Sequence, residues 1–231
     1  MSDKQLLCDF HIHSCNSDGD QPILDIVHLY GMNGFDVIAF TDHFPDSETA
    51  KRIEALGVEF PTLREEELES YFEKLREAGE VAEEQYGMLV IPGIEVTNNT
   101  EKFHILALGV EERIDPDKRP EEIIEEIKSK GGVAVACHPA DDVTESRHRG
   151  NTYLWDNFEE LKDKFDAWEV GNRDDLFPNI GRKKVNFVAN SDMHRKEHLS
   201  SWKTVVEAEK NVESVKESIR KGRTSITYFD I

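Results

Sequence analysis

The sequence predicts an α/β fold in a single domain, residues 1–231, with a barrel as its leading architecture. Short apolar runs alternate with longer amphipathic stretches, which is typical of βα units and a parallel sheet. The 231 residues favour one domain with a substantial core, and the 38% hydrophobic and 33% charged content is that of a globular chain. About eight predicted strands in one domain favour a barrel over an open sheet.

Eight apolar segments are predicted to be strands. They cover residues 6–12, 35–40, 88–96, 103–110, 132–137, 165–170, 185–189 and 224–228. The polar turn Asn98 to Glu101 separates the third segment from the fourth, and this spacing predicts a hairpin.

Helical periodicity fills the stretches between these strands. Apolar residues recur at intervals of three and four in four segments, which predicts helices with one buried face around 23–30, 68–82, 123–127 and 212–219. Gly131 and Gly222 follow the last two patterns, where glycines that end helices are expected.

The charge of the chain excludes several classes of partner. Lys and Arg total 28 and Asp and Glu total 48, so the formal charge is −20. An acidic surface repels phosphate backbones, and we therefore expect no long nucleic acid and no membrane as partner. The N-terminus lacks the pattern of a signal peptide. Cys8, Cys15 and Cys137 form no CxxC pair and are expected to be buried free thiols, so the predicted location is cytoplasmic.

Residues able to bind metal ions lie at the ends of the predicted strands. His11 and His13 share one face at the end of the first strand, because side chains alternate along a strand. Asp192 and His194 repeat this spacing after the strand at 185–189. The remaining candidates at strand ends are His43, Glu95, His104 and His138. In a barrel these ends meet at one rim, so residues from 11 to 194 can form a single pocket.

Each of these motifs alone is a weak indication of a metal site, and only their combination is specific. An isolated HxH pair is more often a hydrogen-bonded pair than a metal site, and a single buried Glu is more often paired with Arg. Six of the nine histidines, however, fall at equivalent strand ends. Imidazoles and carboxylates suit Mn, Zn or Fe. So many ligands exceed the needs of one ion, and the sequence therefore predicts two or three divalent metal ions.

The series of motifs resembles the PHP family, named for polymerase and histidinol phosphatase. The four motifs are His11-Ile12-His13, Thr41-Asp42-His43, Cys137-His138-Pro139 and Ser191-Asp192-Met193-His194. Gly93-Ile94-Glu95, Phe103-His104-Ile105 and Ser17-Asp18-Gly19 lie between them in family order.

This resemblance implies a distorted TIM-like (β/α)7 barrel with three metal ions at its rim. It implies that the first metal is held by His11, His13, Glu95 and Asp192. Glu95 would bridge to a second metal, which His104 and His138 complete, and Asp18, His43 and His194 would hold the third. Ser-Asp-Gly is also the sequence of an ordinary turn, so a structural role is the alternative for Asp18.

Clustered divalent metals suit the hydrolysis of phosphate esters. They lower the pKa of a bridging water and polarise phosphoryl oxygens. We therefore expect a hydroxide between the first two metals to attack phosphorus in a small phosphomonoester or a nucleotide, with a short oligonucleotide left open. Arg149 and Arg195, followed by Arg147 and Arg173, are the candidates for binding the phosphate, because guanidinium groups match its oxygens.

Two other classes are compatible with parts of this pattern. Many amidohydrolase barrels also begin with HxH after a first strand, although they lack the order of Glu95, His104 and His138 and often carry a bridging lysine. A metal-stabilised binding module without catalytic activity is the other alternative.

Overall fold

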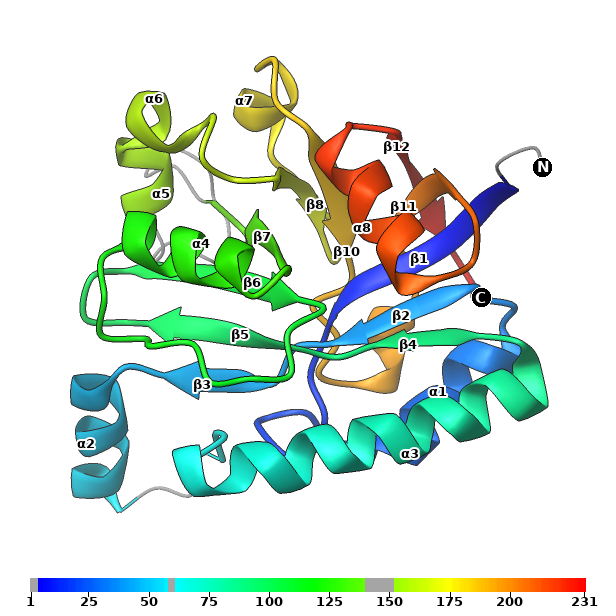
Figure 1. The fold of residues 1–231 in the computed structure, drawn as a ribbon, viewed down its shortest axis with the longest axis horizontal. Coiled ribbons are helices and arrows are strands. Elements are labelled where there is room, and N and C mark those ends of the chain that lie inside the picture. Colours follow the sequence, from blue (N-terminus) through cyan, green and yellow to red (C-terminus); the bar gives the residue numbers. More distant parts are fainter. Residues whose placement is uncertain (1–3, 58–60, 140–151) are drawn as a thin grey trace.

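The structure, a computed structural model, describes residues 4–57, 61–139 and 152–231, and it has the predicted α/β class. Two mixed β-sheets lie between helices, with α1 and α3 along the lower side of the view in Figure 1 and α4 and α8 along the upper side.

The two sheets share the strands unequally. The smaller sheet has the order β12 (Thr224–Phe229), β11 (Ser201–Ala208), β1 (Lys4–Ile12), β2 (Val37–Phe40) and β4 (Leu89–Ile91). The larger sheet has the order β10 (Phe187–Asn190), β8 (Ala167–Asn172), β7 (Val133–Ala136), β6 (Phe103–Leu108), β5 (Gly93–Asn98) and β3 (His43–Pro45), and β9 (Asp175–Leu176) pairs with β8. The predicted hairpin is confirmed, because β5 and β6 pair antiparallel with Glu95 opposite Leu106.

The expectation of a closed barrel is not confirmed. Over the described residues, the strand ladders end at β12 and β4 in one sheet and at β10 and β3 in the other. The segment 88–96, expected as one strand, is divided between the sheets at Pro92, which has no N–H to donate. The chain also crosses from one sheet to the other between β2 and β3, at Thr41 and Asp42. β11 and β12 pair antiparallel at one end of the smaller sheet.

Four helices were predicted, and all four are present. They are α1 (Ile23–Met32), α3 (Leu68–Tyr86), α4 (Pro120–Ser129) and α8 (Val212–Arg220). Gly131 and Gly222 follow the last two with φ of 78° and 64°, the left-handed conformation that ends a helix. The sequence did not predict α2 (Ser47–Leu56) or the short elements α5 (Tyr153–Asp156), α6 (Phe158–Leu161), α7 (Pro178–Gly181), η1 (Glu65–Glu67) and η2 (Lys196–Leu199).

The inner faces of both sheets bury one apolar cluster. Leu6 and Cys8 of β1, Val37 of β2, Leu106 of β6 and Val135 of β7 all belong to it. On β5 and β6 the same face continues beyond this cluster to polar side chains, since His104 lies two residues from Leu106. The fold thereby places polar groups at one end of an apolar interior.

Two further expectations can be compared with the structure. None of the helices in the described ranges is both long and apolar enough to span a membrane. Cys8 and Cys137 are buried free thiols as expected, but Cys15 is exposed, because it lies in the turn after β1 and not on the strand.

Candidate metal centre

The end of β1 supplies His11 and His13. Both imidazoles are fully buried, and their Nε2 atoms lie 3.5 Å and 3.3 Å from Asp192 Oδ1. Asp192 is held near them because the segment after β10 pairs with the end of β1 through a bridge between Ile12 and Met193. Residues about 180 positions apart in the chain are thus joined by backbone hydrogen bonds, with Met193 N donating to His11 O at 3.1 Å.

Glu95 lies at the centre of the cluster. Its Oε1 is 2.9 Å from His104 Nδ1, 3.1 Å from His138 Nε2 and 3.5 Å from His11 Nε2. Its Oε2 is 2.6 Å from His43 Nδ1, without hydrogen-bond geometry. One buried carboxylate therefore contacts imidazoles from four separate segments.

Asp18, His43 and His194 form the outer side of the cluster. Asp18 Oδ1 is 3.1 Å from His194 Nε2 and 3.5 Å from His43 Nε2. The turn that carries Asp18 packs tightly on β1, since a Cβ on Gly19 would lie 2.3 Å from His13 O. The Asp18 and His194 side chains are 20% and 17% exposed, so solvent reaches the cluster from this side.

All nine predicted ligands therefore meet at one place. Four groups within the described chain each bring their ligand atoms within 4.8 Å of one another. The groups are His13–Asp18–His43–His194, His11–His13–Asp192, His11–Glu95–His138 and His43–Glu95–His104.

The polar atoms of this cluster fit divalent cations. His11 Nε2, His13 Nε2, Asp18 Oδ1 and Glu95 Oε2 are buried and have no hydrogen-bond partner. Buried polar atoms are normally satisfied, and leaving them unpaired is costly. Nitrogen and carboxylate oxygen atoms converging in this way are the donor set of a transition-metal site.

The cluster also perturbs its own ionisation. Burial lowers the pKa of His13 to about 3, and the neighbouring His194 and His43 act in the same direction. Burial disfavours the charged form of His43 too, but the Glu95 carboxylate outweighs it and raises that pKa to about 9. Burial raises the pKa of Glu95, yet His43, His104 and His11 hold it well below its usual range. The carboxylates of this cluster are thus ionised at neutral pH.

A buried carboxylate that the sequence motifs did not indicate lies behind the cluster. Glu169 on β8 is fully buried, and its Oε1 lies 3.0 Å from His11 Nδ1. Its Oε2 accepts a hydrogen bond of 2.6 Å from the backbone N–H of His138. The available signal was an isolated acidic residue near the carboxyl end of an apolar strand, which is also the setting of Glu95.

The predicted phosphate-binding arginines have different positions. Arg147 and Arg149 lie outside the described residues. Arg173 lies beside the cluster, where one terminal nitrogen is 3.2 Å from Asp192 Oδ2 and 3.0 Å from His194 Nδ1. Arg195 is exposed, directly after His194.

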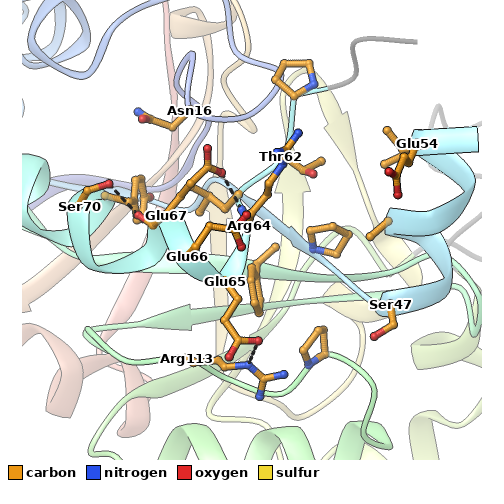
Figure 2. A pocket seen from close by; sticks show the side chains of 18 of the residues that line it. Asn16, Ser47, Glu54, Thr62, Arg64, Glu65, Glu66, Glu67, Ser70 and Arg113 are labelled. Atoms are coloured by element: carbon orange, nitrogen blue, oxygen red, sulfur yellow. Dashed lines mark hydrogen bonds and ion pairs between the residues drawn. The ribbon is translucent and has the colours of Figure 1, made fainter. Parts of the chain in front are cut away.

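A groove of about 960 Å³ lies between α2, the segment 61–67 and the first turns of α3 (Figure 2). Asn16 and Phe44 line it, and these residues follow shortly after His13 and His43 in the chain. Its charged lining is mixed, with four basic side chains (Lys51, Arg64, Lys74, Arg113) and five acidic ones (Glu54, Glu65, Glu66, Glu67, Asp117). Arg113 and Glu65 neutralise each other across it at 2.9 Å.

The chain is similar in sequence or in fold to several known proteins. An uncharacterized protein of Methanocaldococcus jannaschii is 27% identical over 189 residues, covering 77% of this chain and 90% of the relative. A two-domain protein from Bacteroides vulgatus, described as containing a predicted PHP-like metal-dependent phosphoesterase, superposes with a TM-score of 0.69 at 22% identity. That alignment covers 98% of this chain, which spans 65% of the longer protein. An amidohydrolase from Chromobacterium violaceum, solved with sulfate and no metal, gives a TM-score of 0.51 at 15% identity and covers 81% of this chain and 87% of its own.

At these identities the two solved structures show a shared fold only. The family assignment comes from the sequence, in which the PHP domain model matches residues 9–170. That range contains seven of the nine clustered ligands, and the segment after β10 adds Asp192 and His194. This chain belongs to the PHP domain family.

Proposed function

We propose that the protein is a metal-dependent phosphoesterase that hydrolyses a small phosphomonoester or a nucleotide, using two or three divalent ions of Mn, Zn or Fe. The observation that carries this proposal is the convergence of nine imidazole and carboxylate side chains, with four buried ligand atoms left without hydrogen bonds. A cluster of this charge and composition suits cations more than it suits any organic ligand.

The proposed ligand sets are those that the family resemblance implies, and all their members belong to the four groups described above. His11, His13, Glu95 and Asp192 would hold the first cation. Glu95, His104 and His138 would hold the second, and Asp18, His43 and His194 the third. Cations bound there would supply Lewis acidity, lowering the pKa of water and neutralising charge on the phosphoryl oxygens.

The protein's own groups orient the substrate. The ester would enter from the side where Asp18 and His194 are partly exposed. Arg173 holds the Asp192 carboxylate in place, and the exposed Arg195 is the better placed of the two to contact the phosphate.

The test combines elemental analysis with phosphate release. The purified full chain, loaded separately with Mn²⁺ and Zn²⁺, is assayed on sugar phosphates, amino-alcohol phosphates and nucleotides. We expect two or three equivalents of metal and release of phosphate from at least one class.

The same panel separates the alternatives. Release of ammonia or acid from amides or lactones, with no phosphate released, would contradict the proposal and favour an amidohydrolase. Bound metal without turnover on either panel would contradict it in favour of a non-catalytic module.

A further inference from the structure

We infer that Glu169 is a positioning residue, which fixes the proton of His11 on Nδ1 and holds the backbone of His138. The inference deepens the proposed function and rests on it for the role of the two imidazoles as metal ligands. Glu169 touches no other member of the nine-residue cluster in the contacts described above, and it acts from behind the imidazoles.

Glu169 is an acceptor in all its assigned contacts. Oε2 accepts from His138 N at 2.6 Å and from Asn172 Nδ2 at 3.2 Å. Oε1 accepts from Asn190 Nδ2 at 2.9 Å. The orientation of the Asn190 amide is fixed independently, because its Oδ1 accepts the backbone N–H of Phe10 at 2.9 Å. Three donors therefore point at a fully buried carboxylate.

The fourth contact assigns the tautomer of His11. The Nδ1 atom of His11 is 3.0 Å from Glu169 Oε1. The other three contacts make the Glu169 oxygens acceptors, so His11 Nδ1 is the fourth donor and carries a proton. Nε2 is then the nitrogen left to bind a cation, and it faces Glu95 and Asp192 at 3.5 Å without a hydrogen-bond partner. A carboxylate behind a ligating imidazole fixes the ring in this way in many metal sites.

The second effect of Glu169 is on the backbone at His138. His138 has φ of 29°, a conformation that costs energy for a residue with a side chain. The short hydrogen bond from its N–H to Glu169 Oε2 holds this turn, and the imidazole consequently reaches Glu95 Oε1 at 3.1 Å. A single carboxyl group on β8 thus positions two predicted ligands, His11 on β1 and His138 just after β7.

The variant that tests this inference is Glu169→Gln. It keeps the size of the side chain but replaces one acceptor oxygen with an NH₂ group. Whichever way the amide turns, its NH₂ faces either His11 Nδ1 or the His138 N–H. The matched control is Thr204→Val, which removes two buried hydrogen bonds of 2.9 Å and 2.8 Å to Ala189 on β10 and touches no predicted ligand.

The first measurement is the tautomer in the metal-free full chain, by long-range ¹H–¹⁵N correlation of the imidazoles. The His11 signal is assigned by its loss in His11→Gln. We expect Nδ1–H in the wild type and in Thr204→Val, and a shift toward Nε2–H or a tautomer mixture in Glu169→Gln. A wild-type His11 that lacks a proton on Nδ1 would overturn the inference without any variant.

The second measurement is calorimetric titration of the metal-free chain with Zn²⁺. We expect Glu169→Gln to weaken binding about 10- to 100-fold, as loss of such partners typically does, and Thr204→Val to match the wild type. Equal affinity of Glu169→Gln and the wild type would overturn the inference. If the wild type bound neither Zn²⁺ nor Mn²⁺, the proposed function would fail, and the tautomer spectra would still decide the role of Glu169.

Discussion

Replacing Glu95 with Ala is the most informative single perturbation of the cluster. Glu95 belongs to two of the four ligand groups and lies within 3.6 Å of five imidazole nitrogens. Of the three proposed ligand sets, only Asp18–His43–His194 lacks it. We therefore expect Glu95→Ala to retain at most one equivalent of metal and to lose phosphate release.

The same substitution has a cost in the metal-free protein. Removing one member of a buried, charge-compensated set typically costs about 3–5 kcal/mol. For a chain of 231 residues, each kcal/mol lowers the melting temperature by about 2–4 °C. The expected decrease is therefore about 6–20 °C.

Glu126→Ala is the matched control for this experiment. Glu126 is an ion-paired carboxylate remote from the cluster, with Lys118 at 2.9 Å and Lys130 at 3.3 Å. Its loss should cost no more than about 1 kcal/mol and leave metal content unchanged. Metal content is measured by elemental analysis after dialysis, and stability by thermal unfolding with chelator. Wild-type metal content and activity in Glu95→Ala would refute the shared-ligand assignment.

Three further substitutions test how the fold supports the site. Gly93→Ala should lower the free energy of unfolding by about 1–3 kcal/mol, because the added Cβ would lie 2.6 Å from Ala107 O. Gly79→Ala in α3 should raise it by about 0.5–1 kcal/mol, because the added Cβ would lie 3.7 Å from its nearest neighbour. Urea unfolding measures both, and equal effects of the two substitutions would contradict the packing described for Gly93. Lys203→Met should lower the free energy of unfolding by about 3–5 kcal/mol, because it leaves the buried Asp9 carboxyl group, 3.2 Å from Lys203 Nζ, without its ion-pair partner. Adding Asp9→Asn should recover part of that loss. A single Lys203→Met variant as stable as the wild type would show that the two side chains are not coupled. Asp46→Ala should remove about 1 kcal/mol at neutral pH, because Asp46 caps α2 through the N–H groups of Glu48 and Thr49. Hydrogen bonds lower the pKa of Asp46 despite its burial, so this stabilisation is present above pH 3.8, the ordinary pKa, and is lost as the pH falls through the lowered pKa. If the wild type remained more stable than Asp46→Ala in strong acid, the result would contradict the capping role.

The parts of the fold that could be predicted are those with a local signal. The spacing of two between His11 and His13 places both side chains on one face near a strand end, and the structure confirms that they lie together. The hairpin of β5 and β6 was evident from the polar turn between two apolar runs. Gly131 and Gly222 marked two helix ends correctly.

The parts that were missed depend on tertiary contacts. β11 contains Lys203, which is typical of exposed positions but is fully buried here, because Asp9 of the neighbouring strand compensates its charge. β3 has three residues, one of them a proline, so it has little strand signal of its own. It is a strand because it pairs with β5, which is far from it in the sequence. The segment 88–96 is divided at Pro92 because β4 joins the smaller sheet and β5 joins the larger one. The alternation of apolar residues along the segment does not reveal this.

The candidate site was easier to predict than the fold that builds it. The motifs identified the nine side chains that cluster, but they did not identify Glu169, because one acidic residue in an apolar strand does not reveal its partners. Its burial against His11 and His138 follows from the packing of β8 between β7 and β10.

Anomalous diffraction from crystals grown with Mn²⁺ or Zn²⁺ tests the central claim most directly. We predict two or three peaks among the four ligand groups, with Glu95 between two of them. An absence of peaks at Glu95, or metal bound elsewhere while these side chains point apart, would contradict the account.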